Sequence, residues 1–321
     1  MSIETLNICT VTLGTDAKIV NENLIEFNKI YKNVKLHIVC PDKDVQIFKE
    51  SLTEKNYEII TENQLIDFKK FKIIYEELSI NLEYKEKFNH RLQWYYALFL
   101  KFFFMHKFFE NGGLRLVIWE GDSVILKRIK FFNNNSSQLY VWVNYYHEIF
   151  YNTCKEILGN LPKYYGSFIT MFGSSTKEEF DYLNKSLGFE KLSNSEFCYN
   201  FSKKALNSIF KANKNYDNAM FSDYDLIGIN NQNKNFKKQK PIFFLRSSLD
   251  GKLLKLQKMI ARIFGAHLVA YEHRHPNKHS KGMLLRSQSW KRFIKIMVYY
   301  YSLYVFYKFK FNFYYYIKNL F

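Results

Sequence analysis

Two acidic residues, Glu120 and Asp122, directly follow an apolar run that is typical of a buried strand, Leu114 to Trp119. A single glycine, Gly121, separates them, and at a turn two residues with this spacing can face the same site. Carboxylates are the ligands that Mg²⁺ and Mn²⁺ prefer, and such a cation offsets the charge of a departing diphosphate. The pattern predicts a cation and diphosphate site in the largest polar cleft, although a solvated turn could have the same sequence.

Polar residues elsewhere in the chain could complete this site. Asp223 and Asp225 lie in a short polar cluster, where one carboxylate could act as general base on an acceptor hydroxyl. Alternatively, Ser222 or Asp223 caps a helix. His273 is a candidate third metal ligand or a structural histidine. Arg246 follows an apolar run and could clamp a phosphate or simply lie on the surface.

The elements that must position these residues alternate along the chain. Strands are predicted at 6–11, 34–40 and 57–60, with helices between them. This alternation implies parallel pairing in a doubly wound sheet, and ligands of such sheets bind beyond the carboxyl ends of the strands. The polar loop from Thr12 to Asp16, which includes Gly14, lies at such an end and is predicted to meet a nucleotide.

A long apolar helix is predicted from His90 to Glu110, ending at two glycines and leading into the strand at 114–119. Beyond the acid pair we predict a strand at 136–143, helices at 146–158 and 177–187, a polar loop at 232–240, a strand at 241–245, a helix at 253–264 and a last strand at 267–271. The predicted fold class is α/β, with a mixed, mainly parallel sheet flanked by helices.

Several motifs resemble, in order and spacing, those of bacterial GT-A-type glycosyltransferases from surface-polysaccharide and lipooligosaccharide gene clusters. The resemblance runs over residues 6–275. The matching segments are the R-x-Q-W helix (Arg91, Gln93, Trp94), W-D-A-D-T (Trp119-Glu120-Gly121-Asp122-Ser123), an aromatic pair (Phe131-Phe132), S-F-I (Ser167-Phe168-Ile169), F-S-E-Y-E (Phe221-Ser222-Asp223-Tyr224-Asp225) and a closing E-H (Glu272-His273).

The pattern and the resemblance together assign the candidate site residues of a GT-A-like, Rossmann-like domain. The residues expected to bind the nucleotide sugar are Thr12, Gly14, Asp16, Arg91, Gln93, Trp119, Glu120 and Arg246. The expected metal, Mn²⁺ or Mg²⁺, is assigned to Glu120, Asp122 and His273, and the catalytic role to Asp223 and Asp225.

The chain departs from the family's pattern at two places. Glu120 stands where Asp is usual, and its longer side chain would shift a ribose or metal contact. Met171-Phe172-Gly173 follows Thr170 where the family continues with E-H-M, so an acid and a histidine are missing. These departures motivate an alternative, a catalytically degenerate GT-A-like scaffold protein in a surface-glycan assembly complex.

The charge is distributed unevenly along the chain. The net charge is +17, and no Asp or Glu follows Glu272, whereas ten Lys and Arg do. The tail at 276–321 is therefore basic, and it is also rich in Tyr and Phe, which suits an anionic membrane surface. A packed or oligomeric helix and a surface for single-stranded nucleic acid are the alternatives. No nucleic-acid motif is recognisable, and no nucleic-acid partner is predicted.

The four cysteines are far apart and show no C-x-x-C spacing, which predicts buried thiols in a reducing compartment. The N-terminus lacks the pattern of a signal peptide. The longest uncharged run of the tail, Ile296 to Tyr307, has 12 residues, whereas a membrane-spanning helix needs about 20. We expect a cytoplasmic protein that is peripheral on the inner face of the cytoplasmic membrane.

The sequence thus predicts a nucleotide-sugar-binding catalytic domain at 1–275 and a membrane-associated tail at 276–321. The predicted activity is metal-dependent transfer of a sugar, of the hexosyltransferase type, from a nucleotide-diphosphate donor to a hydroxyl of a glycan or lipid-linked acceptor. The predicted pathway is bacterial surface polysaccharide or lipooligosaccharide synthesis.

Overall fold

A five-stranded sheet forms the centre of the computed structural model, which describes residues 5–80, 89, 91–141, 147–159, 167–212, 220–235, 239–247, 254–271, 298, 301, 302 and 305. The strand order is β3-β2-β1-β4-β9, and all neighbours are parallel except β9, which runs antiparallel to β4. The strands are β1 (Leu6–Val11), β2 (Val34–Cys40), β3 (Tyr57–Thr61), β4 (Arg115–Trp119) and β9 (Phe172–Thr176). The predicted α/β class with a mainly parallel sheet flanked by helices is confirmed.

Both faces of this sheet are buried, because successive side chains of a strand point to opposite sides. Ile8 and Ile38 belong to one apolar cluster, and their neighbours Cys9 and Val39 belong to the other. Strands that are buried on both faces read as continuous apolar runs, which is why β1, β2 and β4 could be recognised from the sequence.

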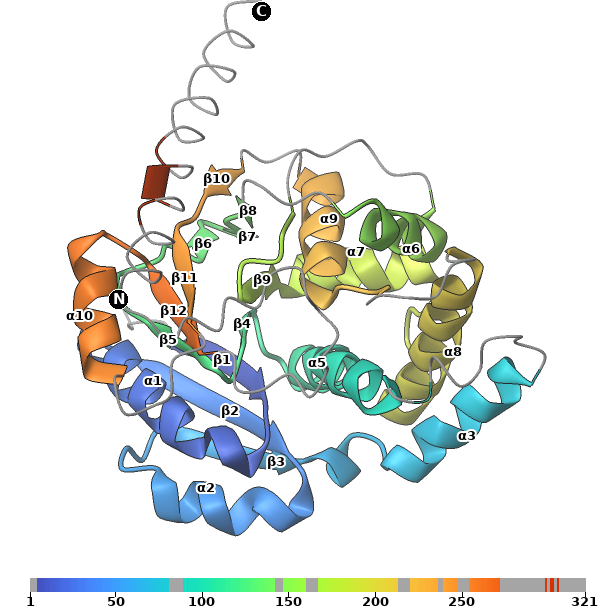
Figure 1. Cartoon of the computed structure of the whole chain (residues 1–321). Coiled ribbons are helices and arrows are strands. Elements are labelled where there is room, and N and C mark those ends of the chain that lie inside the picture. Colours follow the sequence, from blue (N-terminus) through green and yellow to red (C-terminus); the bar gives the residue numbers. More distant parts are fainter. Residues whose placement is uncertain are drawn as a thin grey trace, which may run out of the picture.

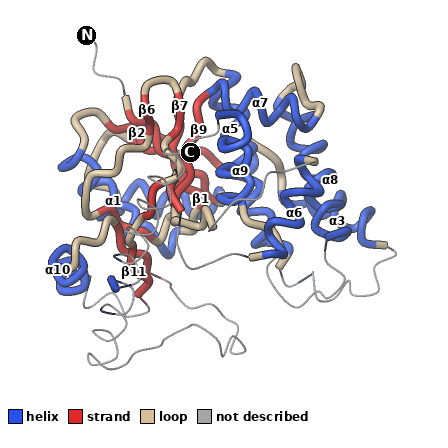
Figure 2. Tube along the Cα trace, turned by 90° about the horizontal axis from the view of Figure 1, so that it is seen from above, coloured by secondary structure: helices blue, strands red, loops and turns tan. Residues whose placement is uncertain are grey.

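Helices cover the two faces in separate groups (Figures 1 and 2). The first core includes residues of α3 (Phe68–Ser79), α5 (Leu92–Glu110), α6 (Glu148–Leu158), α7 (Lys177–Leu187), α8 (Asn194–Ala212) and α9 (Asp223–Asn235). The second core includes residues of α1 (Ala17–Ile30) and α2 (Val45–Ser51). Helix α5 is buried along most of its length and packs on β1.

A smaller sheet adjoins the carboxyl end of β4. Its order is β11-β12-β5, formed by β11 (Phe244–Ser247), β12 (Leu268–Tyr271) and β5 (Ser123–Ile125). Strand β5 begins immediately after the acid pair, and α10 (Leu254–Ile263) contributes Ala261 to the core beside this sheet. The backbone N–H of Tyr271 donates to the backbone oxygen of Asp122 at 2.7 Å, which fixes the turn that carries the two acids.

The sequence predictions fail mainly in the second half of the chain. Helix α8 and strand β9 were not predicted. Helix α9 begins where the alternative of a cap by Ser222 or Asp223 placed a helix, and the Ser222 hydroxyl accepts the N–H of Asp225 at 3.1 Å. This helix extends into the predicted loop at 232–240. In place of a strand at 136–143 there are short pairs, β7 (Ser136–Ser137) with β6 (Phe132–Asn133) and β8 (Tyr140–Val141) with β10 (Lys240–Pro241). The predicted strand at 241–245 is likewise divided between β10 and β11.

The four cysteines are buried free thiols, as expected. Among the described residues, no helix combines the length and the apolar character that crossing a membrane requires. The predicted boundary near residue 275 and most of the basic tail lie outside the described residues. Tyr301 is described, and its ring lies 5.9 Å from that of Phe243 and 6.1 Å from that of Phe264.

Candidate functional site

The loops that follow β1 and β4 meet at the carboxyl edge of the central sheet. Ile8 pairs with Val117 in the parallel ladder, so the two strands end side by side. A Cβ atom placed on Gly121 would lie 2.4 Å from the hydroxyl of Thr12, closer than any real contact. Glycine is therefore required at position 121, and the predicted nucleotide loop and the acid pair form one continuous surface.

A buried hydroxyl lies at the same point. Thr10 is almost fully buried, and its Oγ1 is 3.1 Å from the position that a Cβ of Gly121 would take. Among the described residues this hydroxyl has no hydrogen-bond partner. A buried polar atom without a partner is costly, so it favours a polar ligand beside Gly121.

The centre of the site is an ammonium group that the sequence reading missed. Lys101, from the middle of α5, is 2% exposed, and its Nζ lies 2.9 Å from Glu120 Oε2 and 2.7 Å from Asp223 Oδ2. The ring of Tyr224 lies 4.6 Å from the same Nζ. One lysine thus joins β4, α5 and the first turn of α9.

The charges of this cluster support one another. Burial alone would lower the pKa of Lys101, but Asp223 and Glu120 outweigh that effect and raise the pKa above its usual range. Lys101 is therefore ionised. Burial raises the pKa of the Asp223 carboxyl, and the ammonium group works against that rise. Loss of Lys101 would leave two carboxylates side by side with no cation between them.

Glu120 is the member of this cluster that reaches solvent, with 32% of its side chain exposed. Its Oε2 also accepts a hydrogen bond from the hydroxyl of Tyr224. Burial, followed by the charges of Glu120 and Asp223, raises the pKa of this tyrosine well above its usual value, so the hydroxyl stays protonated and donates. Asp122, two residues on, is half-buried.

The structure does not place Asp223 and Asp225 where an acceptor could reach them, contrary to our expectation. Both carboxylates are buried. Asp225 accepts hydrogen bonds from the backbone N–H of Phe168 at 2.7 Å and from the hydroxyl of Ser167 at 3.2 Å. Burial raises its pKa to about 7. Asp225 therefore anchors the segment at 167–168, and Asp223 anchors Lys101.

The loop after β1 is held by its own acids. The Thr12 hydroxyl donates to Asp16 at 3.0 Å, and the Gly14 N–H donates to Asp44 Oδ2 at 2.8 Å. Asp44 directly precedes α2 and was not among the predicted residues. The donors of Thr12 and Gly14 are thus both engaged within the protein, and the contact of this loop with a nucleotide stays a prediction.

Trp119 belongs to the core and not to a ligand surface. Its ring is completely buried, stacks on Phe172 at 5.5 Å and meets Phe27 edge-on at 4.9 Å. The indole N–H donates to the backbone oxygen of Ser123 at 3.0 Å. The assignment of Trp119 to the nucleotide sugar is therefore corrected, and its role is to fix the turn that contains both acids.

Arg91 and Gln93 lie apart from this centre. The Arg91 guanidinium stacks on Trp94 at 5.7 Å, and Gln93 is exposed. Arg91 precedes Lys101 by ten residues, or about 15 Å of helix. The backbone of Arg246 pairs with Ala270 in the smaller sheet, and its side chain is not described. His273 lies outside the described residues.

The described residues match a divalent cation in charge but do not enclose one. Lys101 opposes Glu120, Asp122 and Asp223, so these four side chains sum to −2. Within the described part of the chain, no three His, Cys, Asp or Glu side chains gather closely enough to hold an ion. The metal assignment to Glu120, Asp122 and His273 therefore stays a prediction.

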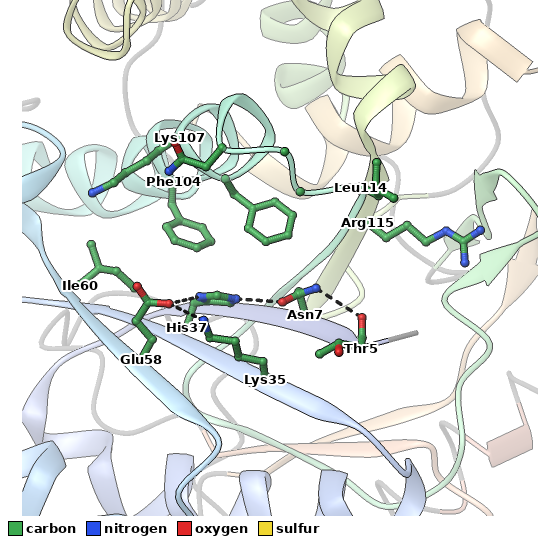
Figure 3. Close-up of a pocket in the computed structure, with 14 residues that line it drawn as sticks. Thr5, Asn7, Lys35, His37, Glu58, Ile60, Phe104, Lys107, Leu114 and Arg115 are labelled. Atoms are coloured by element: carbon green, nitrogen blue, oxygen red, sulfur yellow. Dashed lines mark hydrogen bonds and ion pairs between the residues drawn. The ribbon is translucent and has the colours of Figure 1, made fainter. Parts of the chain in front are cut away.

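A cavity of about 450 Å³ lies at the opposite edge of the sheet, beside the amino ends of β1, β2 and β3 (Figure 3). Neither Glu120 nor Asp122 lines it. The predicted site is instead a polar surface at the carboxyl edge, and the expectation that both acids line the largest cleft gains no support from this cavity.

Lys101 could have been found from the sequence. It interrupts a helix that is otherwise apolar around its whole circumference, in the run ALFLKFFFM. A lysine on such a helix is buried, and a buried lysine needs an acidic partner. The identity of that partner could not be found in this way, because Asp223 is more than one hundred residues away in sequence.

Comparisons with known proteins add little to this geometry. No family model matches the sequence, and no curated protein matches it. Among solved structures, the chain is similar to mouse xyloside xylosyltransferase 1 in its apo form, with 10% sequence identity and a TM-score of 0.42, over 87% of this chain and 100% of that one. At this level the likeness carries no information about activity.

Proposed function

We propose that the chain is a glycosyltransferase that moves a sugar from a nucleotide-diphosphate donor to a hydroxyl of a glycan or lipid-linked acceptor. The observation that carries the proposal is the contact between Gly121 and Thr12 at the carboxyl edge of a parallel sheet. Ligands of such sheets bind at this edge. The missing Cβ lets Thr12 pack directly against the turn, so that a hydroxyl lies beside the pair of acids at the edge where we propose the nucleotide to bind.

In this proposal Glu120 contacts the substrate, and Lys101 with Tyr224 holds it in place. A carboxylate that is fixed by two donors on Oε2 presents a defined acceptor to a hydroxyl of the donor ribose or sugar. Because Asp223 and Asp225 are buried, we transfer the contact with the acceptor from them to the more accessible acids, Glu120 and Asp122.

Dependence on Mn²⁺ or Mg²⁺ is part of the proposal. The sum of −2 over Lys101, Glu120, Asp122 and Asp223 is unsuited to a bare diphosphate and would be offset by one divalent cation. Asp122 is half-buried in the turn after β4, next to Glu120, and is the expected protein ligand. When bound, the cation would offset the charge of the leaving diphosphate.

The test is a thermal-stability screen of UDP-, GDP-, ADP-, dTDP- and CMP-linked sugars, with and without MnCl₂. We expect one class of donor to raise the midpoint only when Mn²⁺ is present. Asp122→Asn should abolish this rise without lowering the midpoint of the ligand-free protein. If no donor stabilises the wild type under either condition, the proposed function fails.

One observation favours a non-catalytic scaffold as the second candidate. Met171 occupies the position where the resembling family has an acid, with a positive φ of 66°, and its backbone oxygen accepts the N–H of Glu120 at 3.0 Å. The segment therefore supports the turn but offers no acid. A scaffold could bind a nucleotide sugar but would neither transfer nor hydrolyse it. Incubation with a lipid-linked acceptor fraction, followed by mass spectrometry of the products, distinguishes a scaffold from an enzyme.

The place of this activity in the cell is also proposed. We propose a role in bacterial surface polysaccharide or lipooligosaccharide synthesis, with the protein in the cytoplasm and its basic tail on the inner face of the membrane. The acid-free composition after Glu272 supports this location. The tail's attraction to anionic lipid is tested by the truncation described in the Discussion.

A further inference from the structure

The cavity at the amino edge of the sheet has the size of a small-molecule site. Its volume is about 450 Å³, within the range of about 300–1,000 Å³ that is usual for such sites. It forms because α5 ends at Glu110 and leaves the first residues of the neighbouring strands uncovered. Figure 3 shows polar side chains of the strands on one side and phenyl rings of α5 on the other.

The polar side is a fixed row of side chains from three adjacent strands. His37 Nε2 lies 3.1 Å from Asn7 Oδ1, and His37 Nδ1 lies 3.3 Å from Glu58 Oε2. Lys35 Nζ lies 2.8 Å from the same carboxylate oxygen. Burial lowers the pKa of His37 to about 4, and Glu58 only partly opposes this, so the imidazole is neutral near pH 7.

The apolar side consists of the rings of Phe104 and Phe108. Their centroids are 6.0 Å apart and lie 5.2 and 5.7 Å from that of His37. The ring of Phe108 rests on Gly113, where a Cβ would come within 2.3 Å of it. Because Gly113 has no side chain, the Phe108 ring can lie directly on the backbone there, beside the cavity.

The charges around the cavity are positive overall, because Lys35, Lys107 and Arg115 line it together with one acid, Glu58. Lys35 is paired with Glu58, and the Arg115 guanidinium donates to the backbone oxygen of Asn134, so two of the three cations are already engaged. A cation is disfavoured here, and an anion would meet mainly Lys107. A neutral ligand meets both donors and acceptors. A sugar ring fits this combination, because each hydroxyl both donates and accepts and because its C–H groups can lie on an aromatic face.

We propose that this cavity is a binding subsite for one neutral sugar unit of the acceptor glycan. The inference rests on the proposed function. Arg115 lines the cavity, and Glu120 follows it by five residues of β4 and the adjoining turn, which corresponds to about 17 Å. The subsite would therefore hold a part of the glycan that does not react, and its binding energy would tether the acceptor near the site of transfer.

The experiment titrates the full-length protein with methyl glucoside, methyl galactoside, methyl mannoside and N-acetylglucosamine, followed by saturation-transfer NMR. The variant is Phe108→Leu, which keeps an apolar side chain but removes the flat ring. The matched control is Phe68→Leu, which alters another half-buried ring, on α3, outside the cavity. We expect at least one sugar to bind the wild type and the control alike, and to bind Phe108→Leu roughly three- to tenfold more weakly.

A second variant guards against misfolding of the first. Glu58→Ala removes a half-exposed acceptor and should also weaken sugar binding. The inference is overturned if none of the four sugars binds saturably, or if both variants bind as tightly as the control. It is also overturned if inorganic phosphate or tetramethylammonium displaces the sugar, because the cavity would then be an ion site.

Asp122→Asn separates the two proposals. It should abolish donor binding at the carboxyl edge and leave sugar binding at the amino edge unchanged. If sugars bind while no nucleotide sugar does, the cavity is a sugar site, but the transferase proposal falls and the acceptor role falls with it. If a donor binds and is turned over while the sugars do not bind, the transferase stands and the subsite falls.

Discussion

At the scale of single residues, the site depends on one buried charge. Lys101 is enclosed among aromatic and aliphatic side chains, and its two carboxylate partners come from different elements. Removing one member of a buried ion pair is strongly destabilising, because the partner charge stays behind. The sequence identified Glu120 and Asp223 as important but assigned them to ligands, because the lysine between them lies in a long, mostly apolar helix and was not considered.

We expect Lys101→Met to lower the free energy of unfolding by about 3–5 kcal/mol, because it leaves Glu120 and Asp223 without their cation. In the double variant, Asp223→Asn should recover a large part of this loss, since it removes one of the two carboxylates that have lost their cation. Urea unfolding at neutral pH measures both changes. Lys107→Met, on the same helix, is the control and should change stability by less than about 1 kcal/mol. Equal effects of the two single variants would contradict the assignment.

Gly121 offers a second test at this scale. We expect Gly121→Ala to cost about 1–3 kcal/mol of stability and to abolish donor binding, because the new methyl group would meet Thr12 at 2.4 Å. Gly173→Ala is the matched control, since its nearest contact would be a terminal methyl group of Ile227 at 3.3 Å. Calorimetric unfolding of both variants, with and without a donor, measures these effects. A Gly121→Ala protein that behaves like Gly173→Ala would refute the close contact between Gly121 and Thr12.

At the scale of elements, the sequence revealed those helices and strands whose buried residues are apolar, and it missed those whose buried residues are polar. Strands β1, β2 and β4 are apolar runs, and they were found to within a residue at each end. Only the start of helix α9 was considered, as a helix capped by Ser222 or Asp223, because its sequence, DYDLIGINNQNKN, is rich in Asn and resembles a loop. Two of its asparagines are buried nonetheless: Asn230 and Asn231 donate to the backbone oxygens of Glu179 and Ser174. Such partners are set by tertiary structure and cannot be seen in the sequence.

The link between α9 and the segment at 167–168 should depend on pH. Burial raises the pKa of Asp225 to about 7, whereas an unfolded aspartate titrates near 4. The folded state thus binds the extra proton between these values, and stability falls as pH rises from about 4 to 7, by up to about 1.4 kcal/mol per pH unit.

Asp225→Asn should remove this component, because an amide oxygen can still accept the N–H of Phe168 but does not titrate. The measurement is the urea midpoint of both proteins across that pH range. Parallel curves for the wild type and the variant would show that Asp225 does not titrate in the fold as described.

At the scale of the whole molecule, charge is concentrated at the C-terminal end. Ten of the 47 basic residues lie after Glu272, in a region without acids. We expect a chain truncated at residue 281 to lose binding to anionic vesicles in co-sedimentation, while full-length protein binds them, more weakly at high salt. Neutral vesicles should bind neither protein well.

The truncation also tests the alternative in which the tail is part of the core. Tyr301 lies beside Phe243 and Phe264, so the thermal midpoint of the truncated protein must be measured together with vesicle binding. A folded truncated chain that no longer sediments supports docking by the tail. Unfolding of that chain, or equal sedimentation of both proteins, rejects it.

The ion cluster around Lys101 also bears on how this sequence can change in evolution. Glu120 and Asp223 contact the same ammonium group from different elements, so the combined length of the two side chains decides whether both reach Lys101. A methylene group removed from one acid can be replaced by a methylene group added to the other. Glu120→Asp alone should destabilise the protein, Asp223→Glu alone should overfill the cluster, and the double variant should restore the unfolding midpoint toward that of the wild type. Substitutions at these two positions are therefore expected to be tolerated together and rejected singly.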